Sequence, residues 1–187
     1  MPHLPYPSDS DIRPEARAVL DAFQKAYGRP SHIFRALSWN KRFVQAASEA
    51  WHSLVVEPTR LDRWVREACV VITCSTQQTE YCVQGHSHAL RREGRHLSES
   101  QVKAIQSCTF EGFAEPQLSI FRFAHKAAAN AKSLTEEDYA GLRRHGLDIE
   151  TILEILGVVW VNTAMNMIVD ALDVRRDDVM VKELDTV

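Results

Sequence analysis

The chain has 187 residues, of which 45% are hydrophobic and 25% charged, and its formal net charge is −3 at pH 7. These values are typical of one folded domain; they exclude a disordered chain and the strongly basic surface of a nucleic-acid-binding protein. No run approaches the roughly 18 uncharged apolar residues of a membrane span, and the opening MPHLPYPSDS lacks the features of a signal peptide. We therefore expect a cytoplasmic protein with no nucleic-acid or membrane partner.

Helix start and stop signals recur along the chain, and no segment predicts a strand. Four of the seven prolines fall in the first fourteen residues, so residues 1–13 are predicted to be a flexible arm. The predicted helices are, in chain order, Pro14 to Tyr27; Ser31 to about Val55; one that follows a Thr59/Asp62 capping box and ends at the polar CSTQQ; Thr79 to about Arg92; one after the Ser98/Gln101 capping box; one from Pro116; one after the Thr135/Asp138 capping box; and one from Asp148 to Leu172.

These seven or eight helices predict an all-α fold, with a single domain over residues 14–174 and a tail over 175–187. The last helix is apolar around most of its circumference, which is typical of a helix shared between the core and a subunit interface. We therefore expect a homo-oligomer. Asn162 and Asn166 lie four residues apart in this helix, and because buried amides need partners, they are predicted to hydrogen-bond to another helix or subunit.

Cysteine usage indicates thiol chemistry and not a disulfide framework or a zinc ribbon, because the spacing of the cysteines fits neither. The four cysteines are Cys69, Cys74, Cys82 and Cys108. If Thr79 is the N-cap of its helix, Cys82 occupies the third helical position, where the helix dipole stabilises a thiolate. His86, one turn later, shares its face and is a proton acceptor for it.

Glu67 lies on the preceding helix, among apolar neighbours. Burial there raises the pKa of a carboxyl group, so that it can pass protons at neutral pH. The structural alternatives remain open: a helical cysteine is most often a small buried hydrophobe, and Glu67 pairs with Arg63 or Arg66 in the simplest case. A metal site formed by Glu67, Cys82 and His86 lacks a fourth ligand.

The spacing Glu67-x11-Thr79-x2-Cys82-x3-His86 resembles the Glu-x11-Cys-x2-Cys-x3-His signature of the alkylhydroperoxidase D (AhpD) and carboxymuconolactone decarboxylase superfamily. The upstream segment LDRWVREACVVITCS resembles the helix that leads into the site of that family. The downstream segment NMIVDALDV resembles the closing NRIVDALGV of its peroxidase-related branch, after a matching FAHKAAANAKSLTEEDYAGLRRHGLD. The likeness covers roughly residues 30 to 174.

The resemblance implies an all-helical fold that assembles as trimers or hexamers. It also implies a thiol-dependent hydroperoxide reductase in which Cys82 attacks the peroxide while His86 and Glu67 relay protons. The chain departs from the family at the first motif cysteine, which is Thr79 here. Thr79 is expected to cap the helix and to support the Cys82 thiolate through its hydroxyl. A peroxidase cycle then needs an external thiol, or a resolving cysteine elsewhere in the chain.

Cys69, Cys74 and Cys108 are the candidates for that resolving thiol, and Cys74 is the nearest, in a predicted loop just before the motif. Loss of the cysteine pair also leaves two other functions open. One is a cofactor-free lyase, like the decarboxylase branch, in which Glu67 and His86 do acid–base chemistry on a carboxylated lactone. The other is a non-catalytic helical oligomer whose site has decayed. None of these functions requires a metal or an organic cofactor.

Overall fold

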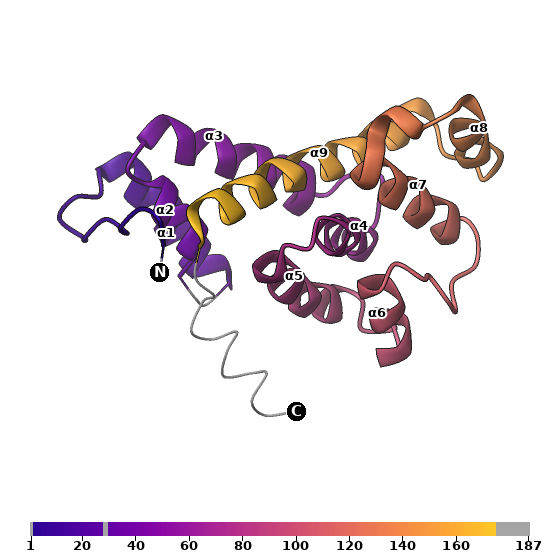
Figure 1. Cartoon of the computed structure of the whole chain (residues 1–187), viewed down its shortest axis with the longest axis horizontal. Helices are drawn as coiled ribbons and strands as arrows, with labels where there is room; N and C mark the ends of the chain where they lie inside the picture. The colour runs from indigo at the N-terminus through magenta and orange to yellow at the C-terminus, as the bar shows by residue number, and fades with distance from the viewer. Residues whose placement is uncertain (1, 28–29, 175–187) are drawn as a thin grey trace. The chain divides into compact units, whose positions relative to one another are not determined.

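The computed structural model describes residues 2–27 and 30–174, and the predicted tail over 175–187 lies outside them. The described residues form an all-α fold with no strand, as predicted (Figure 1). The helices are α1 (Pro14–Tyr27), α2 (His32–Leu37), α3 (Lys41–Trp51), α4 (Arg63–Thr76), α5 (Glu80–Glu93), α6 (Glu99–Gln106), α7 (Gln117–Asn130), α8 (Glu136–Arg144) and α9 (Ile149–Leu172), with a π-helical segment at His52–Val56 and a 3-10 turn at Ala131–Ser133.

The described residues divide into two compact units, one of residues 2–27, 30–52 and 167–174 and the other of Ser53–Asn166. In the first unit, the aromatic rings of Phe23, Phe34 and Trp51 pack against one another across α1, α2 and α3, with centroids 5.6 to 6.2 Å apart. The predicted arm is held by hydrogen bonds from side chains of the same unit. In one of these bonds, Trp39 Nε1 donates to the Pro5 carbonyl oxygen (2.7 Å).

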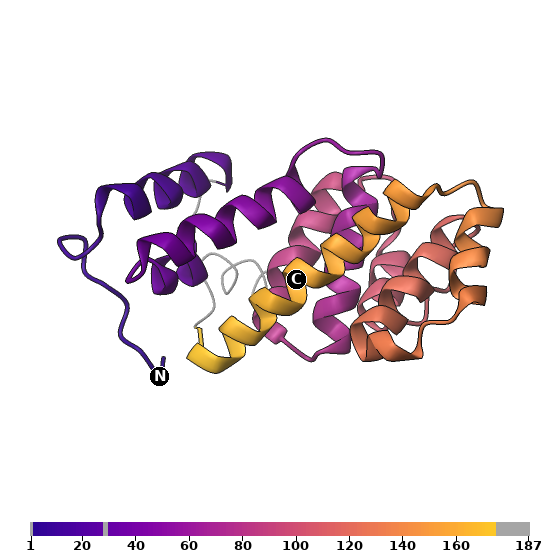
Figure 2. The ribbon, with the colours of Figure 1, turned by 90° about the horizontal axis from the view of Figure 1, so that it is seen from above.

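In the second unit, α4 is the central helix. It contacts α5, α6 and α7, and α9 lies above it in Figure 1 and crosses it in the view of Figure 2. Ten consecutive residues of α4, from Val65 to Cys74, are buried. A helix buried over its whole circumference places polar side chains in an apolar surrounding, where each of them needs a partner.

Two predicted helix boundaries are wrong. The single helix predicted from Ser31 to about Val55 is interrupted after Leu37, because the side chain of Asn40 accepts a hydrogen bond from the Phe43 amide (3.2 Å) and caps a new helix. This split raises the number of α-helices in the described residues to nine. The predicted Thr59/Asp62 capping box does not form: Asp62 is the N-cap of α4 but makes no side-chain capping bond, and Thr59 donates to the Leu61 carbonyl oxygen.

Other predicted boundaries are confirmed. The capping boxes that begin at Ser98 and Thr135 both form, and Asp148 accepts the Thr151 amide at the start of α9 (2.9 Å). By length and composition alone α9 could cross a membrane, although core helices of water-soluble proteins satisfy the same test. Two of its polar side chains, Asn162 and Asn166, are buried, and Asn166 is bonded to residues of the α4–α5 segment.

Candidate active site

The site is formed where one face of α4 meets one face of α5. Arg63, Glu67 and Cys74 are spaced by four and seven residues, so they share a face of α4. Cys82 and His86 share a face of α5, since they lie one turn apart. A short turn reverses the chain between the two helices, with Gln78 in the left-handed region (φ 60°) and the Thr79 amide donating to the Cys74 carbonyl oxygen (3.0 Å).

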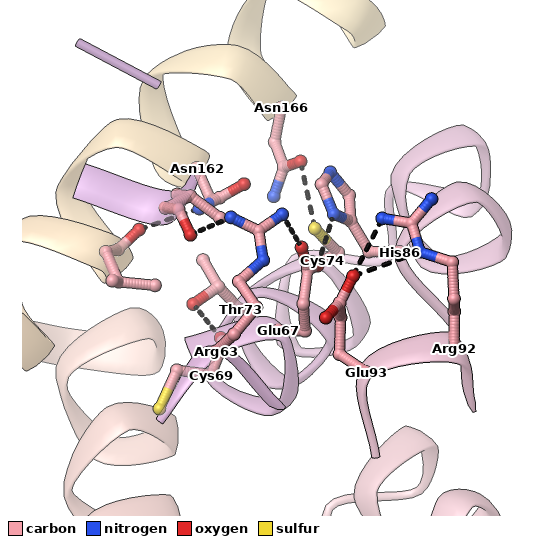
Figure 3. A network of polar contacts seen from close by, with 12 residues as sticks. Arg63, Glu67, Cys69, Thr73, Cys74, His86, Arg92, Glu93, Asn162 and Asn166 are labelled. Carbon is pink, nitrogen blue, oxygen red and sulfur yellow. Dashed lines mark hydrogen bonds and ion pairs between the residues drawn. The ribbon is translucent and has the colours of Figure 1, made fainter. Parts of the chain in front are cut away.

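Glu67 is the centre of the polar network in Figure 3, and its side chain is completely buried. One carboxylate oxygen accepts a hydrogen bond from His86 Nδ1 (2.9 Å), and the other pairs with the guanidinium of Arg63. Burial raises the pKa of Glu67, but the bond and charge of His86, together with the charge of Arg63, outweigh it, and the pKa lies below its ordinary value. The predicted raised pKa is therefore wrong, because the sequence did not show how closely His86 and Arg63 approach this carboxylate.

The ionised Glu67 determines which nitrogen of His86 is basic. A carboxylate only accepts hydrogen bonds, so the imidazole, when it is neutral, carries its hydrogen on Nδ1 and has Nε2 as its basic nitrogen. The His86 side chain is only partly buried, with 19% of its surface exposed. Glu67 thus holds the His86 ring in one orientation and one tautomer. The ion pair with Arg63, which was the structural alternative for Glu67, is present at the same time.

Cys82 and Thr79 occupy the predicted helical positions. Thr79 is the N-cap of α5, and Cys82 follows at the third helical position. The predicted capping bond of the Thr79 hydroxyl is absent, because the Cys82 amide donates to the Thr79 carbonyl oxygen instead (3.1 Å). Thr79 is almost fully buried (1% exposed), whereas Cys82 retains 7% of its surface.

Cys74 lies in the last turn of α4 and not in a loop, contrary to the sequence prediction. Its thiol donates to Asn166 Oδ1 (3.4 Å), as drawn in Figure 3. Burial, and then the neighbouring Cys82, raise the pKa of Cys74 well above its ordinary value. Cys74 is therefore a protonated thiol that neighbours the predicted attacking cysteine.

The other two cysteines lie away from the site, Cys69 on another face of α4 and Cys108 in the segment that follows α6. Cys69 is fully buried, which raises the pKa of its thiol to about 12. The Cys108 thiol contacts the Thr76 hydroxyl (3.8 Å) and the Ile72 carbonyl oxygen (3.9 Å). Ile72 and Thr76 are each two residues from Cys74, which puts them about 160° away around the helix. The structure brings neither Cys69 nor Cys108 to Cys82.

Asn166 is a residue that the sequence analysis did not connect with the site. A helix-to-helix hydrogen bond was predicted for it and is confirmed: its Nδ2 donates to Gln77 Oε1 (2.8 Å), while its Oδ1 accepts from Cys74. Asn162, four residues earlier, instead donates to the Val158 carbonyl oxygen of its own helix (2.9 Å). Within residues 2–27 and 30–174, no group of three or more His, Cys, Asp or Glu side chains is arranged to hold a metal ion.

Comparisons with known proteins show the fold. No protein-family model and no curated protein matches the chain. Two uncharacterized peroxidase-related proteins are similar to it in structure. The one from Ralstonia eutropha JMP134, with an alkylhydroperoxidase AhpD core, is 20% identical over 96% of this chain and 94% of its own, with a TM-score of 0.87. The one from Silicibacter sp. TM1040 is 19% identical over 96% and 93%, also at 0.87.

A third similar structure is the debrominase Bmp8. A cysteine-to-alanine variant of Bmp8, in complex with 2,3,4-tribromopyrrole, is 18% identical over 100% of this chain and 99% of its own, with a TM-score of 0.81. The structural neighbours thus include peroxidase-related proteins and a debrominase. At such low identity the likeness concerns the arrangement of helices, and the chain has the AhpD-like fold.

Proposed function

We propose that the protein is a thiol-dependent hydroperoxide reductase in which Cys82 is the attacking thiol and His86 is its base. One observation carries this proposal: buried Glu67 accepts the Nδ1 hydrogen of His86, and His86 stands one helical turn from Cys82. This arrangement supplies a nucleophile, a base and a group that orients the base, which is the general pattern of an activated thiol. The fold shared with peroxidase-related proteins supports the same reaction.

The reaction balances with these groups alone. The Cys82 thiol proton passes to His86 Nε2, and the thiolate attacks the terminal oxygen of the hydroperoxide. The O–O bond breaks, Cys82 becomes a sulfenic acid, and the leaving alkoxide takes the proton from the imidazolium to form an alcohol. Glu67 stabilises the imidazolium while it exists. Thr79 occupies the position of the first motif cysteine, three residues before Cys82, and its carbonyl oxygen accepts the Cys82 amide.

The test is the rate at which Cys82 is oxidised. Purified protein is mixed with stoichiometric hydrogen peroxide or an organic hydroperoxide, quenched at intervals and mapped by mass spectrometry. We expect oxidation at Cys82 much faster than for the same protein in urea, with a strong decrease in His86→Ala and no change in the control Cys108→Ser. Oxidation of Cys82 no faster than in urea would refute the proposal.

A second candidate follows from the likeness to the debrominase. The Cys82 thiolate is a soft nucleophile, and two thiols can supply the two electrons that replace bromine on an aromatic ring by hydrogen, with release of bromide and formation of a disulfide. Incubation with 2,3,4-tribromopyrrole and measurement of bromide separates this reaction from peroxide reduction. The lyase alternative has less support, because an ionised Glu67 paired with Arg63 is not a proton donor.

A further inference from the structure

We propose that Cys74 is the resolving cysteine for Cys82, so that the redox pair joins the end of α4 to the start of α5. This inference rests on the proposed function, since it names the thiol that completes the hydroperoxide cycle. It assigns the role of the missing first motif cysteine, whose position is occupied by Thr79, to a residue five positions earlier on another helix.

The geometry of the turn places Cys74 and Cys82 on its two sides. The Thr79 amide donates to the Cys74 carbonyl oxygen (3.0 Å), and the Cys82 amide donates to the Thr79 carbonyl oxygen (3.1 Å). These two bonds tie the residue that precedes the turn to the residue that follows it. Cys82 is also the neighbouring group that, after burial, raises the pKa of the Cys74 thiol. Both cysteines are free thiols here, so both are available to form a disulfide across the turn.

The two thiols differ in a way that assigns their order of reaction. Cys82 retains 7% exposure and Cys74 has none, so a hydroperoxide reaches Cys82 first. The Cys74 thiol is also held as a donor: Asn166 Nδ2 is bonded to Gln77 Oε1 (2.8 Å), which turns Asn166 Oδ1 toward the Cys74 sulfur (3.4 Å). A thiol that donates a hydrogen bond is a poor first nucleophile but is in place to attack a sulfenic acid.

The second half of the cycle then balances. The Cys74 sulfur attacks the sulfenic sulfur of Cys82, the S–O bond breaks, and the hydroxyl leaves as water with the proton of Cys74. The product is a disulfide between the two residues. An external dithiol reductant, such as dithiothreitol in the assay, restores both thiols by exchange and is itself oxidised to a disulfide.

The experiment follows the products of stoichiometric peroxide in four proteins: wild type, Cys74→Ser, Cys74→Ala and the control Cys69→Ser. Serine keeps a donor toward Asn166, while alanine tests whether that bond matters for folding; circular dichroism checks all four. We expect wild type and Cys69→Ser to lose two hydrogen atoms and to yield a linked Cys74–Cys82 peptide. Both Cys74 variants should accumulate Cys82 sulfenic acid, which dimedone traps, and then sulfinic acid, and should lose turnover with dithiothreitol.

A parallel arm with diamide separates this inference from the proposed function, because diamide oxidises neighbouring thiols without a peroxidase step. A Cys74–Cys82 disulfide with diamide, but no oxidation of Cys82 by peroxide, would support the pair and refute the peroxidase. Rapid oxidation of Cys82 to sulfinic acid in wild type and variants alike, without a disulfide, would refute the pair and leave the peroxidase standing. Absence of both reactions would refute both.

Discussion

Replacement of Glu67 by glutamine tests the central contact of the site, because it keeps the shape of the side chain and removes its charge. The carboxylate accepts from His86 and from Arg63 with one oxygen each. An amide has only one oxygen, so Glu67→Gln weakens one of these bonds and presents an NH2 group to the other donor. The weakened bond costs about 1 kcal/mol and the unsatisfied buried donor about 2 kcal/mol, so the free energy of unfolding should fall by about 3 kcal/mol at pH 7.

The pKa shift of Glu67 predicts how its contribution to stability changes with pH. The pKa of Glu67 is lower in the folded protein than its ordinary value of 4.5, so its charge stabilises the folded state fully above that value. This contribution is lost as the pH falls through the lower, folded-state pKa. The difference in stability between wild type and Glu67→Gln should therefore be full at pH 7 and should shrink in acid.

Urea denaturation of both proteins, at pH 7 and at successively lower pH, measures this difference. The matched control is Glu99→Gln, which also removes a carboxylate bonded to an arginine, but at the surface: Arg91 donates to Glu99 at 3.0 and 3.1 Å. Exposed ion pairs contribute little, so the control should be close to wild type. A Glu67→Gln protein as stable as wild type at pH 7, or a difference that persists unchanged in acid, would contradict our account of the site.

Three further predictions concern other parts of the molecule. Thr79→Cys should form a disulfide with Cys82 on mild oxidation, detected by peptide mapping; no such bond would mean that the start of α5 differs from the family geometry. Cys69, with a pKa of about 12, should resist iodoacetamide at pH 8 in the folded protein and react in urea. The exposed apolar side chains Leu153 and Trp160 of α9 (60% and 61% exposed) should form a subunit interface. Light scattering should therefore give a trimer or hexamer that Trp160→Glu dissociates, and a monomeric wild type would contradict this.

Local signals predicted most of the helices but not where a helix continues through polar residues. The capping boxes at Ser98 and Thr135 are visible because their partners lie three residues away. Asn40 was missed because apolar residues with helical spacing continue on both sides of it. Cys74 was assigned to a loop because Ser, Thr and Gln follow it, yet Thr76 stays in the helix by donating to the Ile72 carbonyl oxygen (2.7 Å).

Only those site residues that helical spacing or the family likeness indicates could be predicted from the sequence. Cys82 and His86 share a face by their spacing alone, and the family likeness added Glu67 and Thr79. The contact between Cys74 and Asn166 spans 92 residues of sequence, and it depends on how α9 crosses α4, which no local pattern determines. The predicted direction of the Glu67 pKa shift was wrong for the same reason, since the shift depends on packing between helices.

The ion pair between Arg63 and Glu67 has a consequence for the electrical balance of the buried cluster. The two charges cancel, so the Arg63–Glu67 pair adds no net charge to the cluster. In the proposed reaction, a proton that passes from Cys82 to His86 creates a thiolate and an imidazolium together, which leaves the net charge of the cluster unchanged. Burying a net charge is costly, whereas creating an adjacent pair of opposite charges is much less so. Arg63 therefore lets the site separate charge without taking up or releasing a proton to solvent.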